Sequence, residues 1–111
     1  MKVAVIGSRS LSVSNLGKYL PDGTNEIVSG GAVGIDRWAR DYAVSRGIKL
    51  TEFLPEYDKY GRYAPLKRNI SIIEYSDAVI AFWDGKSRGT KFVIDKCRIK
   101  NKPIKIYLKT R

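Results

Sequence analysis

Short runs of apolar residues alternate along the chain with longer segments in which apolar residues recur at helical spacing. The short runs predict β-strands at residues 2–6, 26–29, 49–54, 77–83 and 104–108. The longer segments predict helices at residues 14–20, 35–46, 64–75 and 90–101. Strands and helices that alternate in this way are typical of βα units arranged around a parallel sheet.

The predicted helices end at residues that stop helices. Gly47 follows the second helix, Pro103 follows the fourth, and Pro21 closes the first. The first and fourth strands are the most apolar, so we expect them at the centre of the sheet. We therefore predict a single minimal, Rossmann-like α/β domain over residues 1–111. It has three layers and a mainly parallel five-stranded sheet in the order 3-2-1-4-5.

Length and composition exclude several classes of protein. The chain has 111 residues, too few for two ordinary domains, and no apolar run approaches the roughly 20 residues of a membrane span. We therefore expect a cytoplasmic protein without a membrane partner. The absence of histidine excludes catalysis by serine–histidine or cysteine–histidine pairs. The single cysteine, Cys97, excludes an intrachain disulfide and a zinc–thiolate cluster. We expect no metal site and no required cofactor.

The charge of the chain is concentrated near its end. The net charge is +10, and residues 86–111 carry ten basic residues and one acidic residue. Such an asymmetry favours a polyanionic partner or a phosphate-bearing ligand, although lysines on a helix surface also serve only to keep a domain solvated. If the partner is a nucleic acid, the candidates on the last helix and just beyond it are Lys91, Arg98 and Lys102.

Glycine-containing turns follow three of the five predicted strands. Because the carboxyl ends of parallel strands meet at one edge of a sheet, we expect the three turns to lie together. Glycines allow close approach of a ligand to the backbone, and helix N-termini bind phosphate. The candidate binding positions in the turns are Gly7, Ser8 and Arg9, then Gly30, Gly31, Ala32, Gly34 and Asp36, then Gly85, Lys86, Ser87, Gly89 and Thr90.

Other residues extend this candidate site. Arg68 and Asn69, near the start of the third predicted helix, add a cation and an amide. Asp36 either caps its helix or accepts hydrogen bonds from a ribose. A face for a nucleobase is expected from one of four aromatic residues, namely Trp83, Tyr57, Tyr60 and Tyr63.

Two familiar motifs are incomplete or absent. The third turn has the G-x-S-x-G pattern of a nucleophile elbow, but a chain without histidine lacks the usual base. Neither a Walker A sequence nor a G-x-G-x-x-G dinucleotide fingerprint is present, which removes support for ATPase and ordinary dehydrogenase activities.

A series of short motifs follows one another along the chain: Val5-Ile6-Gly7-Ser8-Arg9, Ser29-Gly30-Gly31-Ala32, Gly34-Ile35-Asp36, Ala39, Arg68-Asn69, Ser76-Asp77, Phe82-Trp83 and Ser87-x-Gly89-Thr90. The order of these motifs resembles the SLOG superfamily of Rossmann-like proteins, named after Smf/DprA and LOG, and within it most closely the short stand-alone branch related to YspA and cpYpsA. The resemblance covers essentially the whole chain and implies binding of nucleotides or nucleotide-derived ligands, by dimers or higher homo-oligomers.

The chain departs from two better-understood branches of that superfamily. LOG phosphoribohydrolases, which cleave the base from nucleoside monophosphates, carry P-G-G-x-G-T-x-x-E, and here Gly89-Thr90 matches while the glutamate position is Val93. Such an activity would need another carboxylate, and Asp36 and Asp84 are the candidates beside the turns. DprA-like proteins bind single-stranded DNA through a basic surface, but residues 86–111 contain few aromatic residues for stacking.

The leading hypothesis is a non-catalytic binding module for a nucleotide or nucleotide-derived ligand, acting as a sensor or adaptor. The alternatives are a LOG-like nucleotide N-glycosidase and a DprA-like single-stranded nucleic-acid binder.

Overall fold

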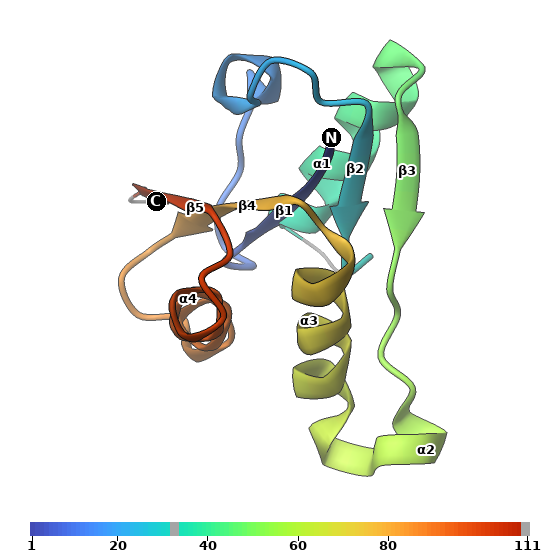
Figure 1. The fold of residues 1–111 in the computed structure, drawn as a ribbon, viewed down its shortest axis with the longest axis vertical. Coiled ribbons are helices and arrows are strands. Elements are labelled where there is room, and N and C mark those ends of the chain that lie inside the picture. Colours follow the sequence, from blue (N-terminus) through green and yellow to red (C-terminus); the bar gives the residue numbers. More distant parts are fainter. Residues whose placement is uncertain (32–33, 110–111) are drawn as a thin grey trace.

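Five strands form one sheet in the computed structural model, which describes residues 1–31 and 34–109 (Figure 1). The strands are β1 (Lys2–Gly7), β2 (Glu26–Ser29), β3 (Lys49–Glu52), β4 (Ala78–Trp83) and β5 (Ile104–Leu108). Their order is β3-β2-β1-β4-β5, and every pair is parallel. The predicted α/β class and strand order are confirmed, with β1 and β4 inside the sheet.

Three helices of twelve residues flank the sheet: α1 (Ile35–Arg46), α3 (Ala64–Tyr75) and α4 (Arg88–Ile99). The first two have the predicted bounds. Helix α4 begins and ends two residues earlier than predicted, and Ser87 caps its N-terminus. Between β3 and α3 the chain forms two short turns, α2 (Tyr57–Tyr60) and η2 (Gly61–Tyr63). The strand predicted to reach residue 54 ends at Glu52.

The α-helix predicted at residues 14–20 is wrong. This part of the chain forms only a four-residue 3-10 turn, η1 (Leu16–Tyr19). Apolar residues there enter the core separately from an irregular loop, as Leu11, Val13 and Leu16 do, so their spacing does not reflect a helical face. Gly17 packs tightly, because a Cβ atom at this position would lie 2.6 Å from Tyr42 Oη.

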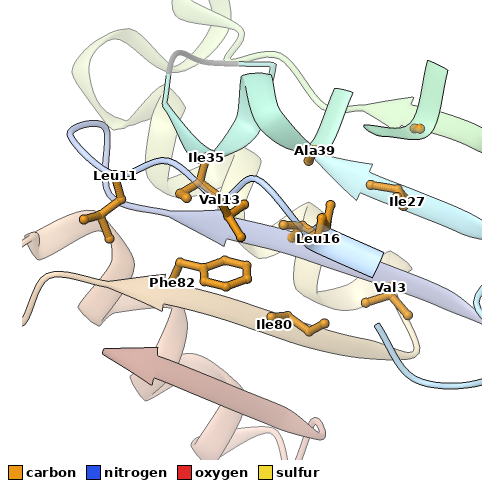
Figure 2. Close-up of a cluster of buried hydrophobic side chains, with 11 residues drawn as sticks. Val3, Leu11, Val13, Leu16, Ile27, Ile35, Ala39, Ile80 and Phe82 are labelled. Carbon is orange, nitrogen blue, oxygen red and sulfur yellow. The ribbon is translucent and has the colours of Figure 1, made fainter. Parts of the chain in front are cut away.

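Each face of the sheet has its own apolar core. On one face, shown in Figure 2, Ile35 and Ala39 of α1 pack with Val3, Ile80 and Phe82 of the central strands. On the other face, Ile72 and Ile73 of α3 and Val93, Ile94 and Cys97 of α4 pack against the sheet. The domain therefore has three layers, and the unbroken apolar runs of β1 and β4 are explained by burial on both faces.

Candidate functional site

A cleft of about 260 Å³ lies where the carboxyl ends of β1 and β2 meet the first turns of α1 and α4 and the amino-terminal half of α3. All three glycine-containing turns contribute to it. Its polar and glycine lining consists of positions that the sequence suggested, namely Gly7, Arg9, Gly30, Asp36, Arg68, Asn69, Ser87, Gly89 and Thr90. The parallel topology thus brings together segments that lie far apart in the sequence.

The first turn continues from β1. Gly7 is packed so closely that a Cβ atom there would lie 2.5 Å from Ile35 Cγ1 and 2.7 Å from the carbonyl oxygen of Phe82. Arg9 is exposed and lines the cleft. Ser8 does not line it. The Ser8 side chain is buried, and its Oγ accepts a hydrogen bond from the backbone N–H of Asp84 over 3.3 Å, so the hydroxyl joins the first turn to the third.

The second turn leads from β2 into α1. Gly34 is the N-cap of α1 with φ +76°, and a side chain there would clash with the backbone of Arg9, so the first two turns are in contact. Gly31, with φ +68°, borders a neighbouring depression rather than the cleft. Ala32 lies outside the described residues. Asp36 occupies the first turn of α1, two residues after the N-cap, and lines the cleft while only 8% exposed.

Arg68 connects α3 to the second turn. Its Nη1 donates to the carbonyl oxygens of Gly30 at 2.8 Å and Phe53 at 3.4 Å, and its Nε donates to Asn69 Oδ1 at 2.8 Å. Burial lowers the pKa of the Arg68 guanidinium, the nearby Asp36 carboxylate opposes that shift, and the positive charge of Arg9 adds to it. The cleft therefore places two cations close to one carboxylate.

The third turn leads from β4 into α4. Asp84 Oδ1 accepts hydrogen bonds from the backbone N–H groups of Ser87 and Lys86, each at 2.8 Å, and these bonds lower the pKa of Asp84. Ser87 Oγ accepts from the N–H of Thr90 at 3.4 Å and lies 3.3 Å from Thr90 Oγ1. Gly85 has φ +82° and lies outside the cleft lining, as does the exposed Lys86. Asp84 shapes the turn, and the first turn of α4 borders the cleft.

The expected aromatic face for a base is not found in the cleft lining. Trp83 donates from Nε1 to the carbonyl oxygen of Ser87 at 3.0 Å and does not line the cleft. Tyr57 and Tyr63 are 58% and 54% exposed on the α2–η2 segment, and Tyr60 borders a separate pocket. Among the described lining residues none is aromatic. A base would have to contact aliphatic side chains or an aromatic residue at the rim.

Four apolar residues of the cleft lining were not predicted from the sequence: Ile6, Pro65, Ile72 and Val93. Ile6, Ile72 and Val93 belong to the apolar core on the α3–α4 side of the sheet, and their pattern resembles that of other core residues. The only signal was Val93, which occupies the glutamate position of the motif compared above. It is 2% exposed.

The basic residues proposed for nucleic-acid contact are engaged to different extents. Lys91 pairs with Asp95 at 2.8 Å. Lys102 donates from Nζ to the carbonyl oxygen of Ser76 at 2.5 Å, joining the connection between α4 and β5 to the C-cap of α3. Arg98 is exposed. Two of the three side chains thus have partners within the domain.

Comparison of the chain with protein-family models, with curated proteins and with solved structures gives no match. Within residues 1–31 and 34–109, no group of three or more cysteine, aspartate or glutamate side chains is arranged to hold a metal ion. No helix in this part of the chain combines the length and apolar character needed to cross a membrane.

Proposed function

We propose that the cleft binds a ligand containing phosphate and ribose, a nucleotide or a nucleotide derivative, and that the domain acts as a non-catalytic binding module. The observation that carries this proposal is that Arg9 and Arg68 line one cleft together with the first turn of α4. An anion bound there is attracted by both guanidinium groups and accepts hydrogen bonds from the helix N-terminus. The resemblance to SLOG proteins favours the same conclusion.

The phosphate and the ribose would contact different parts of the cleft. Arg9 is exposed and free to move toward a phosphate, and Thr90 and Gly89 lie at the start of α4. Arg68 is already held by backbone carbonyls, so it contributes mainly its charge. The buried carboxylate of Asp36 is suited to accept hydrogen bonds from ribose hydroxyls.

The chemistry of the lining favours binding over catalysis. Val93 places an aliphatic side chain where the LOG motif has its glutamate, and valine neither transfers protons nor stabilises a cation. Asp84 is held by the backbone of its own turn, and its lowered pKa makes it a poor proton donor at neutral pH.

A second candidate function is nucleotide N-glycoside cleavage, which the buried carboxylate of Asp36 in the cleft favours. Such a reaction needs a carboxylate to stabilise positive charge on the ribose as the base leaves. It predicts free base released from a nucleoside monophosphate, detected by chromatography, and its loss in Asp36→Asn. Binding without release of base contradicts this candidate and leaves the first intact.

The test of binding is thermal unfolding with nucleoside monophosphates, NAD, ADP-ribose and an oligonucleotide, with inorganic phosphate as reference. A ligand at 100 times its dissociation constant stabilises the native state by about 2.7 kcal/mol. We expect a selective increase in Tm with a nucleotide, reduced in Arg9→Ala and Thr90→Ala.

The matched control is Arg98→Ala, which removes an exposed arginine on α4 away from the cleft lining. It should leave the nucleotide effect unchanged. An increase in Tm with the oligonucleotide alone, reduced in Arg98→Ala, would contradict the proposal and favour a nucleic-acid partner. Equal effects of nucleotides and inorganic phosphate would contradict the ribose contact.

A further inference from the structure

An apolar groove of about 550 Å³ lies on the face of the sheet that carries α1, beginning at the amino ends of β4 and β5. It shares no lining residue with the cleft described above. We refer to it as the β4–β5 groove. Its apolar lining includes Tyr19, Leu20, Pro21, Ile80, Pro103 and Tyr107.

The groove exists because the connection between β1 and β2 contains no α-helix. On this face α1 packs mainly on β1, β2 and β3, and it lies beside β1 and β2 in Figure 1. The β4–β5 half of the face is covered instead by the short turn η1. Its Tyr19 ring contacts Phe82 and Tyr107 with centroid distances of 5.1 and 4.8 Å. The floor beyond this aromatic contact is left open.

The charged side chains that line the groove are all of one sign. Lys18 and Lys105 line it and are exposed, and Lys109 donates from Nζ to Tyr19 Oη over 2.9 Å. No aspartate or glutamate is among the described residues that line it. An occupant that covers the apolar floor therefore also meets lysine side chains, and negative charges on the occupant are favoured.

These features favour an acidic protein segment over other occupants. A second copy of the chain, with net charge +10, would bring the same lysines together across a two-fold axis. A nucleic acid would satisfy the lysines, but the rings of Tyr19 and Tyr107 already pack against each other and against Phe82, and a sugar–phosphate backbone gains little from covering leucine, proline and isoleucine. An acidic segment with apolar side chains matches both the floor and the rim.

We infer that the β4–β5 groove is a docking site for an acidic protein segment that carries apolar or aromatic anchor residues. This interaction is separate from ligand binding in the cleft. A partner bound there would leave the cleft open, so the two sites can be occupied together.

The test uses a short labelled peptide in which glutamates alternate with leucine and phenylalanine. Its binding is followed by fluorescence anisotropy and by amide chemical-shift changes in the full chain. We expect the largest shifts at Lys18–Tyr19 and at the first residues of β5. We expect Lys18→Glu with Lys105→Glu to weaken binding by about tenfold or more, since each removes an attraction and adds a repulsion.

The matched control is Lys59→Glu with Lys67→Glu, which changes the net charge equally at exposed positions on α2 and α3. This variant should bind the peptide almost as the wild type does. A second control peptide keeps the glutamates and replaces the apolar residues with serine, and it should bind much more weakly.

Four results with the peptides and the double variants would overturn the inference. They are no binding of the acidic apolar peptide, equal binding of the serine peptide, equal weakening by both double variants, and shifts confined to residues outside the groove. If oligothymidylate shifts the same amide signals, displaces the peptide and binds more tightly, the groove is a nucleic-acid surface instead. A dimer in sedimentation that excludes the peptide from the groove would identify a second copy as the occupant.

Discussion

Arg68 of α3 donates a hydrogen bond from Nη1 to the carbonyl oxygen of Gly30, 2.8 Å away at the end of β2. This bond joins the third helix to the second glycine turn and holds a guanidinium at the wall of the cleft. The absence of a side chain at Gly30 makes it possible. A Cβ atom there would lie 2.6 Å from Arg68 Nη1 and 3.0 Å from Asp36 Oδ2.

Gly30→Ala is therefore expected to displace Arg68 while preserving the fold. The clash is with the far end of a flexible side chain, and the φ angle of Gly30 is not in the left-handed region. Loss of the hydrogen bond should lower the free energy of unfolding by about 1 kcal/mol, measured by urea denaturation. The increase in the free energy of unfolding that a nucleotide causes should also be smaller in the variant than in the wild type. Unaltered stabilisation would show that Arg68 does not act in the cleft.

Gly89→Ala is expected to weaken nucleotide binding without lowering stability, unlike Gly30→Ala. A Cβ atom at Gly89 would meet no other atom within 4 Å, and the residue lies in the first turn of α4. Alanine is a better helix former than glycine, so the free energy of unfolding should stay the same or rise by up to about 1 kcal/mol. The added methyl group would nevertheless occupy space at the helix N-terminus where we place the phosphate. Calorimetric titration should show weaker nucleotide binding, and undiminished binding would exclude that placement.

The sequence was sufficient to predict the sheet order and the convergence of the three turns. Both depend on properties that repeat along the chain, namely two-sided burial of β1 and β4 and the shared edge of parallel strands. The sequence was not sufficient to predict the conformation of the segment around η1. Leu11, Val13 and Leu16 reach the core from a loop whose path depends on the rest of the fold.

Side-chain directions at the site were also beyond the sequence. Ser8 and Trp83 stand in the right turns, yet Ser8 contacts the backbone of Asp84 and Trp83 contacts that of Ser87. The Ser8 bond depends on how the first and third turns pack, and the Trp83 bond depends on the path of the third turn itself. Ile72 and Val93 were not predicted to line the cleft, because residues at the base of a cleft have the same apolar pattern as the core around them.

Cys97 is expected to be unreactive in the folded protein. Its side chain is fully buried against the sheet, and burial raises the pKa of the thiol to about 11, with Lys102 opposing the shift. Since the thiolate is the reactive form, alkylation by iodoacetamide at neutral pH should be slow. Adding urea should increase the rate in parallel with unfolding followed by circular dichroism. Rapid labelling of the native protein would contradict the buried position.

Glu26, at the amino end of β2, links the stability of the domain to pH. It is 7% exposed, and its Oε2 accepts hydrogen bonds from Tyr75 Oη at 2.5 Å and Thr51 Oγ1 at 2.7 Å. The Tyr75 hydrogen bond is the main cause that lowers the pKa of Glu26 below its ordinary value of 4.5. The folded state therefore binds fewer protons than the unfolded state in this range. The stabilisation is complete above about pH 4.5 and is lost as the pH falls through the pKa of the folded state.

Tyr75→Phe should remove the largest single cause of this pH dependence. The variant leaves Glu26 with one hydrogen-bond donor fewer, so the free energy of unfolding at pH 7 should fall by about 1 kcal/mol. The pKa of Glu26 should move back toward its ordinary value. The variant should therefore lose less stability than the wild type between pH 5 and pH 3. Urea denaturation at these pH values measures the free energy of unfolding of both proteins. The difference between the wild type and the variant should become smaller as the pH falls. A constant difference across the range would mean that the Tyr75 hydroxyl stabilises the domain independently of the charge on Glu26, because phenylalanine keeps the ring contact with Phe53, at a centroid distance of 5.4 Å.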